Sequence, residues 1–215
     1  MQLINQVNLI TGGCGRIGKA AAFEFAKSGS HLVISDISLE KLEVLKKDIL
    51  EIYDIDIKII ECDITKQSEI RTLIKNSFEF KGFLSGAVNS AYPISKGWGC
   101  AFEELEENYL KEDLFSQLGS AILFSKEILG SFLVQGYGNL INISSIQGIS
   151  APKFNHYEGT SMNSPIEYSA IKSGIISITK WLAKYYSNKN IRINCISPGG
   201  ILDNQPKAFL DKYRS

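Results

Sequence analysis

The sequence has few of the residues that build metal centres or disulfide frameworks. Histidine occurs only twice, as His31 and His156, and no two cysteines form a Cys-x-x-Cys pair. The four cysteines are Cys14, Cys62, Cys100 and Cys195. Zinc sites and disulfide frameworks both need such residues at short, characteristic spacings. The sequence therefore predicts no metal site and four free, mostly buried thiols.

An excess of one charge, a basic leader and a long apolar run are also lacking. The 23 lysines and arginines balance the 23 aspartates and glutamates, so the net charge suggests neither a nucleic-acid nor a membrane-surface partner. No apolar run reaches the roughly 18 residues of a membrane-spanning helix, and the N-terminus has no signal-peptide pattern. With 44% hydrophobic residues among 215, the chain is expected to form one cytoplasmic domain, residues 1–215.

What the sequence does have is an alternation of strand-like and helix-like segments. Apolar, strand-like runs occupy residues 7–10, 31–36, 58–64, 83–89, 138–145 and 191–196. Helix-like segments separate them, at 19–27, 38–52, 67–78, 102–134 and 165–186. This alternation predicts an α/β fold, a doubly wound, Rossmann-like parallel sheet of about six strands with helices on both faces.

A glycine-rich turn follows the first predicted strand. Gly13-x-Gly15-x-x-Gly18 stands between a strand and a helix, the context in which this pattern indicates dinucleotide binding. Glycines permit a tight turn and close approach of the backbone to a pyrophosphate, whose charge the helix N-terminus favours. A glycine-rich turn without a ligand is the alternative.

Asp36 ends the second predicted strand, about twenty residues past the glycines. A carboxylate there can accept hydrogen bonds from an adenosine ribose and would repel a 2′-phosphate, so NAD is favoured over NADP. Arg16, beside the glycines, keeps NADP open because its guanidinium could meet a phosphate. Asp36 could instead cap the helix that follows.

Tyr168 and Lys172 are the residues most suited to chemistry. On a helix, positions i and i+4 share a face, so the phenol and the ammonium can point into one cleft. A nearby cation lowers the tyrosine pKa from about 10, which would allow proton exchange with an alcohol or carbonyl near neutral pH. The alternative is an ordinary pair on a helix surface.

Polar or turn residues end or follow each predicted strand, and in open α/β sheets these strand ends form the ligand-binding edge. They are the Gly12–Gly18 turn, Asp36, Asp63, Asn89, Ser144-Ser145 and Pro198-Gly199. On these residues the chain resembles the short-chain dehydrogenase/reductase family over nearly its whole length.

The resemblance implies cofactor contacts residue by residue. Thr11-Gly12 through Gly18 looks like the family's cofactor turn, including Gly13, Gly15, Arg16 and Ile17, although Arg16 stands where a glycine is usual. Asp63-Ile64 matches the family's adenine contact, Asn89-Ser90 is similar to its Asn-Asn-Ala-Gly element, and Pro198-Gly199 matches its nicotinamide-side turn.

The resemblance also implies the catalytic residues. Ser145 would hydrogen-bond the substrate oxygen, Tyr168 would exchange the proton, and Lys172 would lower the tyrosine pKa and hold the nicotinamide ribose. For the serine pair, the alternative is a polar strand end that satisfies backbone groups. Gln117 aligns with the family's catalytic asparagine and offers the same amide on a longer arm, so it is either a fourth catalytic residue or a plain helix-face residue.

Two further features depart from the family pattern. Ser145 and Tyr168 are 23 positions apart, about ten more than is typical, and the extra residues fall in 149–164. Tyr157 lies nearer the usual distance from Ser145, but position 161 is serine, so Tyr157 has no lysine partner. The segment 149–164 is either a substrate lid or a passive surface insertion.

The second departure is at the C-terminus. Family members usually continue through a further helix and strand, and Asp203 stands where a threonine often contacts the cofactor carboxamide. The sequence therefore looks truncated, with an incomplete sheet edge and oligomer interface. The full-length protein is expected to be a homo-oligomer.

The resemblance implies an NAD(P)-dependent oxidoreductase that interconverts a secondary alcohol and a carbonyl on a small-molecule substrate. Segments near residues 159–165 and 197–205 look like those of dehydrogenases associated with surface-carbohydrate biosynthesis, including flagellin-modification proteins, which suggests a sugar-derived substrate. Two alternatives stay open: a dinucleotide-binding protein with little turnover, and a nucleotide-sugar isomerase or dehydratase that recycles bound NAD.

Overall fold

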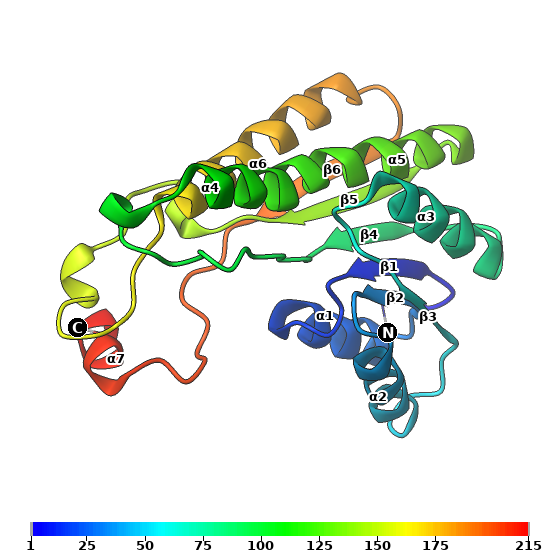
Figure 1. Cartoon of the computed structure of the whole chain (residues 1–215). Helices are drawn as coiled ribbons and strands as arrows, with labels where there is room; N and C mark the ends of the chain where they lie inside the picture. The colour runs from blue at the N-terminus through cyan, green and yellow to red at the C-terminus, as the bar shows by residue number, and fades with distance from the viewer. Residues whose placement is uncertain (1, 215) are drawn as a thin grey trace.

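The computed structural model describes residues 2–214 and confirms the α/β fold. Six strands form one parallel sheet in the order β3-β2-β1-β4-β5-β6 (Figure 1). The strands are β1 (Val7–Thr11), β2 (His31–Asp36), β3 (Ile57–Glu61), β4 (Gly86–Asn89), β5 (Gly138–Ile143) and β6 (Ile191–Ile196). The strand order reverses between β1 and β4, and sheets of this kind bind ligands at the carboxyl ends of the strands beside that point.

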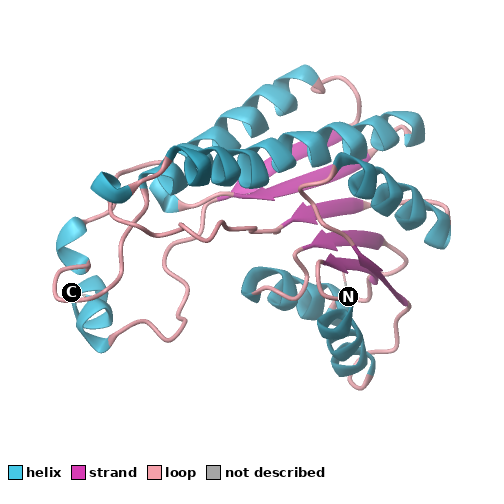
Figure 2. Ribbon diagram, in the orientation of Figure 1, coloured by secondary structure: helices cyan, strands magenta, loops and turns pink. Residues whose placement is uncertain are grey.

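Helices cover both faces of the sheet (Figures 1 and 2). On one face lie α1 (Arg16–Lys27) and α2 (Leu39–Leu50), and on the other lie α3 (Gln67–Lys81), α5 (Ser120–Gln135) and α6 (Ile166–Tyr185). The shorter elements are α4 (Glu107–Asp113), the π-helical turn η2 (Leu114–Gly119), α7 (Lys207–Arg214) and the 3-10 turns η1 (Phe102–Glu104), η3 (Ile146–Gly148) and η4 (Phe154–His156).

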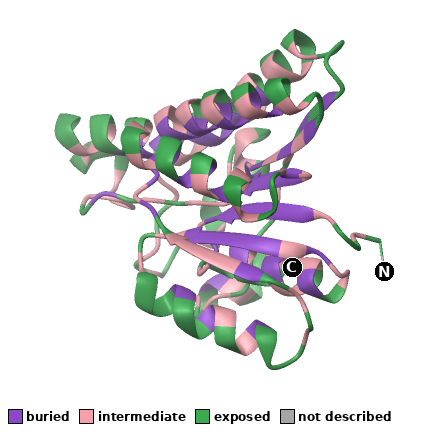
Figure 3. Cartoon of the chain, turned by 90° about the vertical axis from the view of Figure 1, so that its right-hand side faces the viewer, coloured by how far each residue is buried: buried purple, intermediate pink, exposed green. Residues whose placement is uncertain are grey.

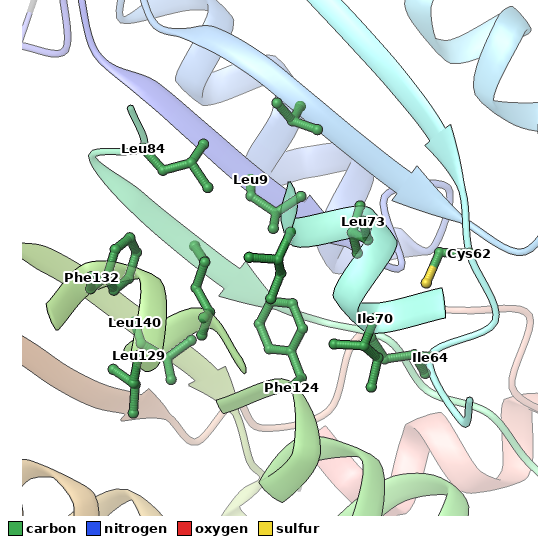
Figure 4. Close-up of a cluster of buried hydrophobic side chains, with 14 of the residues drawn as sticks. Leu9, Cys62, Ile64, Ile70, Leu73, Leu84, Phe124, Leu129, Phe132 and Leu140 are labelled. Atoms are coloured by element: carbon green, nitrogen blue, oxygen red, sulfur yellow. The ribbon is translucent and has the colours of Figure 1, made fainter. Parts of the chain in front are cut away.

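The core is divided by the sheet into two layers. Leu9 packs with Phe124 and Phe132 in the layer beneath α3 and α5, which Figure 4 shows. Its neighbour Ile10 packs with Leu42 in the layer beneath α1 and α2. Successive strand residues point to opposite faces, so a strand covered on both sides needs the continuous apolar run seen in the sequence. Figure 3 shows the resulting buried strands and inward helix faces.

Three strands are shorter than the sequence predicts, because the apolar runs continue past the sheet ladder. Leu84 donates its N–H to the Gln135 side chain (3.1 Å) rather than to a strand, so β4 starts at Gly86. Asp63 donates its N–H to the Glu69 carboxylate (2.7 Å), beyond the end of β3. Local side-chain acceptors replace the ladder at these ends, and apolar periodicity does not reveal them.

Strand β6 forms one edge of the sheet. Its residues Ile191 and Ile193 belong to the core beneath α5, whereas Arg192, Asn194 and Ile196 alternate with them and are exposed. Within residues 2–214, β6 is thus covered on one face only.

The continuous helical run Glu107–Gln135 is long and apolar enough, by length and composition alone, to cross a membrane. Phe124, Ile128 and Phe132 on this run are fully buried in the core, and 44% of its most apolar window is buried. Packing against the sheet accounts for its apolar character, as in the core helix of a globular protein.

Candidate active site

A groove of about 1000 Å³ lies along the carboxyl edge of the sheet. It brings together most residues that the sequence nominates: Gly12, Gly15, Arg16, Ile17, Asp36, Asp63, Ile64, Ser90, Ser145, Tyr168, Lys172, Pro198 and Gly199. Gly13, Gly18, Asn89 and Gln117 are not among its lining residues. The parallel sheet explains the convergence, because all its strands end at this edge.

The glycine turn is shaped by contacts that leave no room for side chains. Gly12 has a positive φ of 61°, and a Cβ there would lie 2.6 Å from Ala91 Cα. A Cβ on Gly18 would overlap the Gly12 carbonyl oxygen and lie 2.8 Å from Gly13 Cα. Helix α1 starts after Gly15 with no side-chain cap and no acid in its first turn. Its first N–H groups therefore suit a phosphate, and the turn fits a dinucleotide.

Asp36 binds the glycine turn rather than capping a helix. Its carboxylate accepts a hydrogen bond from Cys14 N–H at 2.9 Å. The cap of α2 is Ser38, whose hydroxyl accepts from Lys41 N–H at 3.4 Å, so the capping alternative for Asp36 is wrong. Burial, together with the Asp36 charge, raises the pKa of the Cys14 thiol to about 11. The Asp36 carboxylate remains at the groove, where the sequence predicts it.

Asp63 and Ile64 lie farther along the groove, past the end of β3. The Asp63 carboxylate accepts hydrogen bonds from the Thr65 N–H (3.0 Å) and hydroxyl (2.7 Å). Burial alone would raise the pKa of Asp63, but these bonds and the Lys66 ammonium lower it. Asp63 is therefore an ionised acceptor with a fixed orientation.

Asn89 lies behind the groove and joins strand ends to one another. Its side chain accepts a hydrogen bond from the Thr11 hydroxyl (2.8 Å) and donates one to Asn142 (3.5 Å). Asn142 in turn donates to the Thr179 hydroxyl on α6 (3.3 Å). Ser90 lines the groove itself, and its hydroxyl donates to the Thr11 carbonyl (2.6 Å). The buried polar chain holds β1, β4, β5 and α6 in register.

The two serines after β5 have different roles. The Ser144 hydroxyl donates to the Lys172 carbonyl (2.8 Å) and so ties the strand end to α6. Ser145 lines the groove, where its hydroxyl is hydrogen-bonded to the Tyr168 phenol and accepts from Gln147 N–H (3.2 Å). The alternative of a polar strand end that satisfies backbone groups describes Ser144 fully, whereas the Ser145 hydroxyl both caps a backbone N–H and contacts the Tyr168 phenol.

Tyr168 stands in an aromatic enclosure. Its ring makes edge contacts with Tyr92 and Trp98, with centroids 6.1 and 5.9 Å away. Burial raises the pKa of Tyr168, and the hydrogen bond with Ser145 opposes that rise. This differs from the expectation that Lys172 lowers the pKa. In the structure, loss of water around the phenol outweighs the hydrogen bond from Ser145.

Lys172 is buried beside the rings of Tyr92 and Tyr168. Its ammonium donates a hydrogen bond to the Ile143 carbonyl (3.1 Å) and lies 5.0 Å from the Tyr92 ring centre and 5.5 Å from that of Tyr168. Burial lowers its pKa from 10.5 to about 8. The ammonium therefore faces aromatic rings rather than a carboxylate, and such contacts hold a cation without neutralising it.

Replacing Lys172 with methionine is expected to change how stability depends on pH. The folded pKa (about 8) lies below the unfolded value (10.5), so the unfolded chain binds more protons between these values and wild-type stability rises with pH there. The methionine variant lacks this term. Its free energy of unfolding relative to wild type should fall by roughly 1–3 kcal/mol from pH 8 to above pH 10, measured by urea unfolding. A pH-independent difference would contradict the buried ammonium.

Gln117 lies in the π-helical turn η2 between α4 and α5, and only 4% of it is exposed. Neither its amide nitrogen nor its amide oxygen has a hydrogen-bond partner among the described residues. An unpaired buried amide is costly, and π-helical turns occur often at functional sites. Gln117 is therefore a buried residue whose amide lacks a partner among the described residues, and its catalytic role stays a prediction.

Segment 149–164 packs against α7 rather than against the sheet. The Tyr157 ring lies 5.2 Å from that of Phe209, and the His156 ring lies 5.4 Å from that of Tyr213. Tyr157, Phe209 and Tyr213 also line the groove. In Figure 1 this segment and α7 form a separate lobe beyond the carboxyl edge. The segment is therefore part of the groove wall.

Gln147 links this segment to Ser145, and sequence reasoning missed it. Its amide nitrogen donates to the Tyr157 hydroxyl (3.3 Å), and its amide oxygen accepts from the Ser164 hydroxyl (2.7 Å). Its backbone N–H binds Ser145. In the sequence, only its position two residues after Ser145 could have indicated that Gln147 belongs to the site. Sequence reasoning also missed Tyr92 and Trp98, because their approach to Tyr168 depends on a long connection.

No group of three or more metal-ligating side chains occurs within residues 2–214.

Comparison with known proteins agrees with this geometry. Residues 6–208 match the family model for short chain dehydrogenases. Over 213 residues the chain is 41% identical to post-translational flagellin modification protein A of Campylobacter coli, covering 99% of this chain and 83% of that protein. It is 29% identical to 7alpha-hydroxysteroid dehydrogenase of Bacteroides fragilis, covering 92% of this chain and 72% of that enzyme.

A solved structure gives the same result. A short chain dehydrogenase from Leptospira borgpetersenii with bound NAD+ superimposes with a TM-score of 0.82 at 27% identity, covering 99% of this chain and 78% of that one. Sequence, fold and the placement of Ser145, Tyr168 and Lys172 therefore lead to one conclusion: the chain belongs to the short-chain dehydrogenase/reductase family, whose members are NAD(P)-dependent oxidoreductases acting on CH–OH groups.

Proposed function

We propose that this protein interconverts a secondary alcohol and a carbonyl with Ser145, Tyr168 and Lys172 as its catalytic residues. The observation that carries the proposal is the Tyr168 phenol, hydrogen-bonded to Ser145 and flanked by the buried Lys172 ammonium, in the same groove as the glycine turn. A phenol, a hydroxyl and a cation are the groups needed to bind and protonate a carbonyl oxygen.

Each of the three proposed catalytic residues has a separate role. Ser145 donates a hydrogen bond to the substrate oxygen, and Tyr168 gives that oxygen a proton or takes one from it. The Lys172 charge stabilises the phenolate that forms, which the enclosed site would otherwise disfavour. NAD(P), when bound, supplies or accepts the hydride. The glycine turn, Asp36 and the Pro198–Gly199 turn are the residues that would hold it.

Gln117 is proposed as a fourth member that returns protons to Lys172 through water. A water between them would satisfy the unpaired amide, since buried polar groups of this kind are usually bridged by ordered water. Gln117→Leu, close in size, should lower kcat by about tenfold or more while folding stability changes little, because the leucine removes the amide together with its need for a water partner.

The Gln117→Leu result separates two roles. Steady-state kinetics and urea unfolding are measured on the same preparations, with Gln117→Asn expected to restore part of kcat. If the leucine variant keeps full kcat and gains stability, Gln117 is a helix residue without a catalytic role.

NAD is the proposed cofactor. The Asp36 carboxylate lies at the groove, where it would accept hydrogen bonds from an adenosine ribose and repel a 2′-phosphate. NADH should bind at least about tenfold more tightly than NADPH, a difference of about 1.4 kcal/mol, in fluorescence titrations. Equal affinities would contradict the assignment of Asp36.

The proposed substrate is sugar-derived. The resemblance to flagellin-modification dehydrogenases, from which the sequence suggests this class, agrees with the 41% identity to post-translational flagellin modification protein A. The groove is lined by the rings of Tyr92, Trp98 and Tyr157 and by side-chain amides, which are those of Gln147, Asn163 and Gln205. Aromatic faces pack on the apolar face of a sugar ring, and amides bind its hydroxyls. We further propose that segment 149–164 is the substrate lid, and that the protein is a cytoplasmic homo-oligomer when full length.

A substrate panel tests the function. NADH oxidation should occur with keto-sugars and their derivatives, and activity only with steroids or fatty-acyl carbonyls would exclude the sugar assignment. NADH binding without turnover on any substrate would indicate a dinucleotide-binding protein instead. Stoichiometric NAD that co-purifies would favour a nucleotide-sugar isomerase or dehydratase.

A further inference from the structure

The ion pair between Arg16 and Asp203 joins two walls of the groove. Arg16 is the first residue of α1, directly after the glycine turn, whereas Asp203 lies in the connection between β6 and α7. Both residues line the groove. In Figure 1 the β6–α7 connection descends beside the start of α1. The pair thus links the start of α1 to the β6–α7 connection.

Arg16 and Asp203 both belong to backbone segments that other contacts hold in place. The Asp203 N–H donates to the Gln205 side chain (2.6 Å), and that side chain donates back to the Ile201 carbonyl (2.8 Å). The Gly200 N–H donates to the Tyr213 hydroxyl (2.7 Å), which ties the same connection to α7. On the other side, Arg16 follows the closely packed glycine turn. Because both backbones are held in place, the ion pair restrains the glycine turn and the β6–α7 connection relative to each other.

The path of a dinucleotide along the groove passes this pair. Asp36 and Asp63 lie at one end, Ser145 and Tyr168 lie at the other, and the glycine turn with Arg16 lies between them. We infer that the Arg16–Asp203 pair forms a bridge that closes over the bound dinucleotide, and that Asp203 is a positioning residue that slows cofactor release. The inference rests on the proposed function.

The chemistry of the pair suits a bridge that opens readily. The Arg16 and Asp203 side chains are 59% and 33% exposed, so their attraction is modest and is screened by salt. A guanidinium has five N–H donors, and Arg16 can therefore bind Asp203 and a cofactor phosphate at once. A weak contact of this kind alters the rate of release more than it alters the fold.

The rate of NADH release tests the bridge without any substrate. NADH-loaded protein is mixed with excess NAD in a stopped-flow fluorimeter, and the fluorescence decay gives the dissociation rate constant. Asp203→Asn should increase this rate about two- to fivefold, as expected for losing a partly exposed ion pair. Asp203→Glu should restore most of the slow release. Asp211→Asn is the matched control, because it removes the same charge from exposed α7 without breaking a described ion pair.

A double-mutant cycle assigns the effect to the pair. Arg16→Gln should also speed release, and the Arg16→Gln/Asp203→Asn double variant should release NADH no faster than the faster single variant. Higher salt should reduce the ratio of the NADH dissociation rate constant of Asp203→Asn to that of wild type, because salt screens the ion pair.

Two outcomes overturn the inference. If wild type binds NADH normally but Asp203→Asn releases it at the wild-type rate, or if the two single effects simply multiply, the bridge is wrong and the proposed function stands. If wild type binds no NADH, the proposed function fails and the bridge fails with it. Circular dichroism of each variant, all changed at exposed or half-exposed positions, checks that the fold is intact.

Discussion

Alanine at position 18 is expected to weaken NADH binding at least about tenfold and to lower the free energy of unfolding by about 1–3 kcal/mol. The Gly18 Cα faces the Gly12 carbonyl and Gly13 Cα, so an added methyl group would overlap backbone that has no rotamer to change. The glycine turn must then move away from α1, and it carries the proposed phosphate contacts with it. Fluorescence titration with NADH and urea unfolding measure the two effects.

Gly130→Ala is the matched control for this substitution. Gly130 is an exposed residue of α5, and a Cβ there meets nothing within 4 Å. Removing a glycine from an exposed helix should stabilise the protein by up to about 1 kcal/mol and leave NADH binding unchanged. If Gly18→Ala behaved like Gly130→Ala, the packing of the glycine turn against α1 would be described wrongly.

Tyr168→Phe is expected to lower kcat by about 10²–10⁴-fold while NADH binding changes little. The substitution removes only the hydroxyl, which is the proposed proton donor and the partner of Ser145, and the ring contacts with Tyr92 and Trp98 remain. Stability should change by no more than about 1 kcal/mol, because one hydrogen bond is lost. Initial rates of NADH oxidation, with NADH affinity measured separately, distinguish chemistry from binding.

The control for this experiment lies on the same helix. Tyr185 near the end of α6 is 66% exposed and stacks on Trp181 at 4.9 Å. Tyr185→Phe keeps that stack and should preserve full activity. Turnover by Tyr168→Phe at the rate of this control would refute the role of the phenol, and Tyr157, the other phenol held near Ser145 through Gln147, would be the next candidate.

The succession of strands and helices along the chain and the sheet edge that carries the site follow from local sequence patterns. Apolar runs separated by helical periodicity define strands and helices, and a right-handed parallel arrangement then places every strand end on one side. Tyr168 and Lys172 are four residues apart on one helix, so their common face is also a local property. The glycine spacing between β1 and α1 is local in the same way.

The electrostatic environment of the same residues depends on distant parts of the chain. Trp98 reaches Tyr168 from the long connection after β4, and Ile143 supplies the carbonyl that binds Lys172. These contacts bury both groups, which raises the pKa of Tyr168 and lowers that of Lys172. A pairwise argument from the sequence considered only the attraction between cation and phenolate. It therefore omitted the loss of solvation, which needs the whole enclosure.

The sequence by itself determined the fold class, the family and the residues that meet at the carboxyl edge, because these depend on periodicity and on motifs of a few residues. Only the tertiary structure decided that Asp36 binds the glycine turn, that Gln147 joins segment 149–164 to Ser145, and that Arg16 pairs with Asp203 across the groove. Each of these contacts joins residues on separate elements or loops. Their geometry is set by how the elements pack, and no spacing along the chain encodes it.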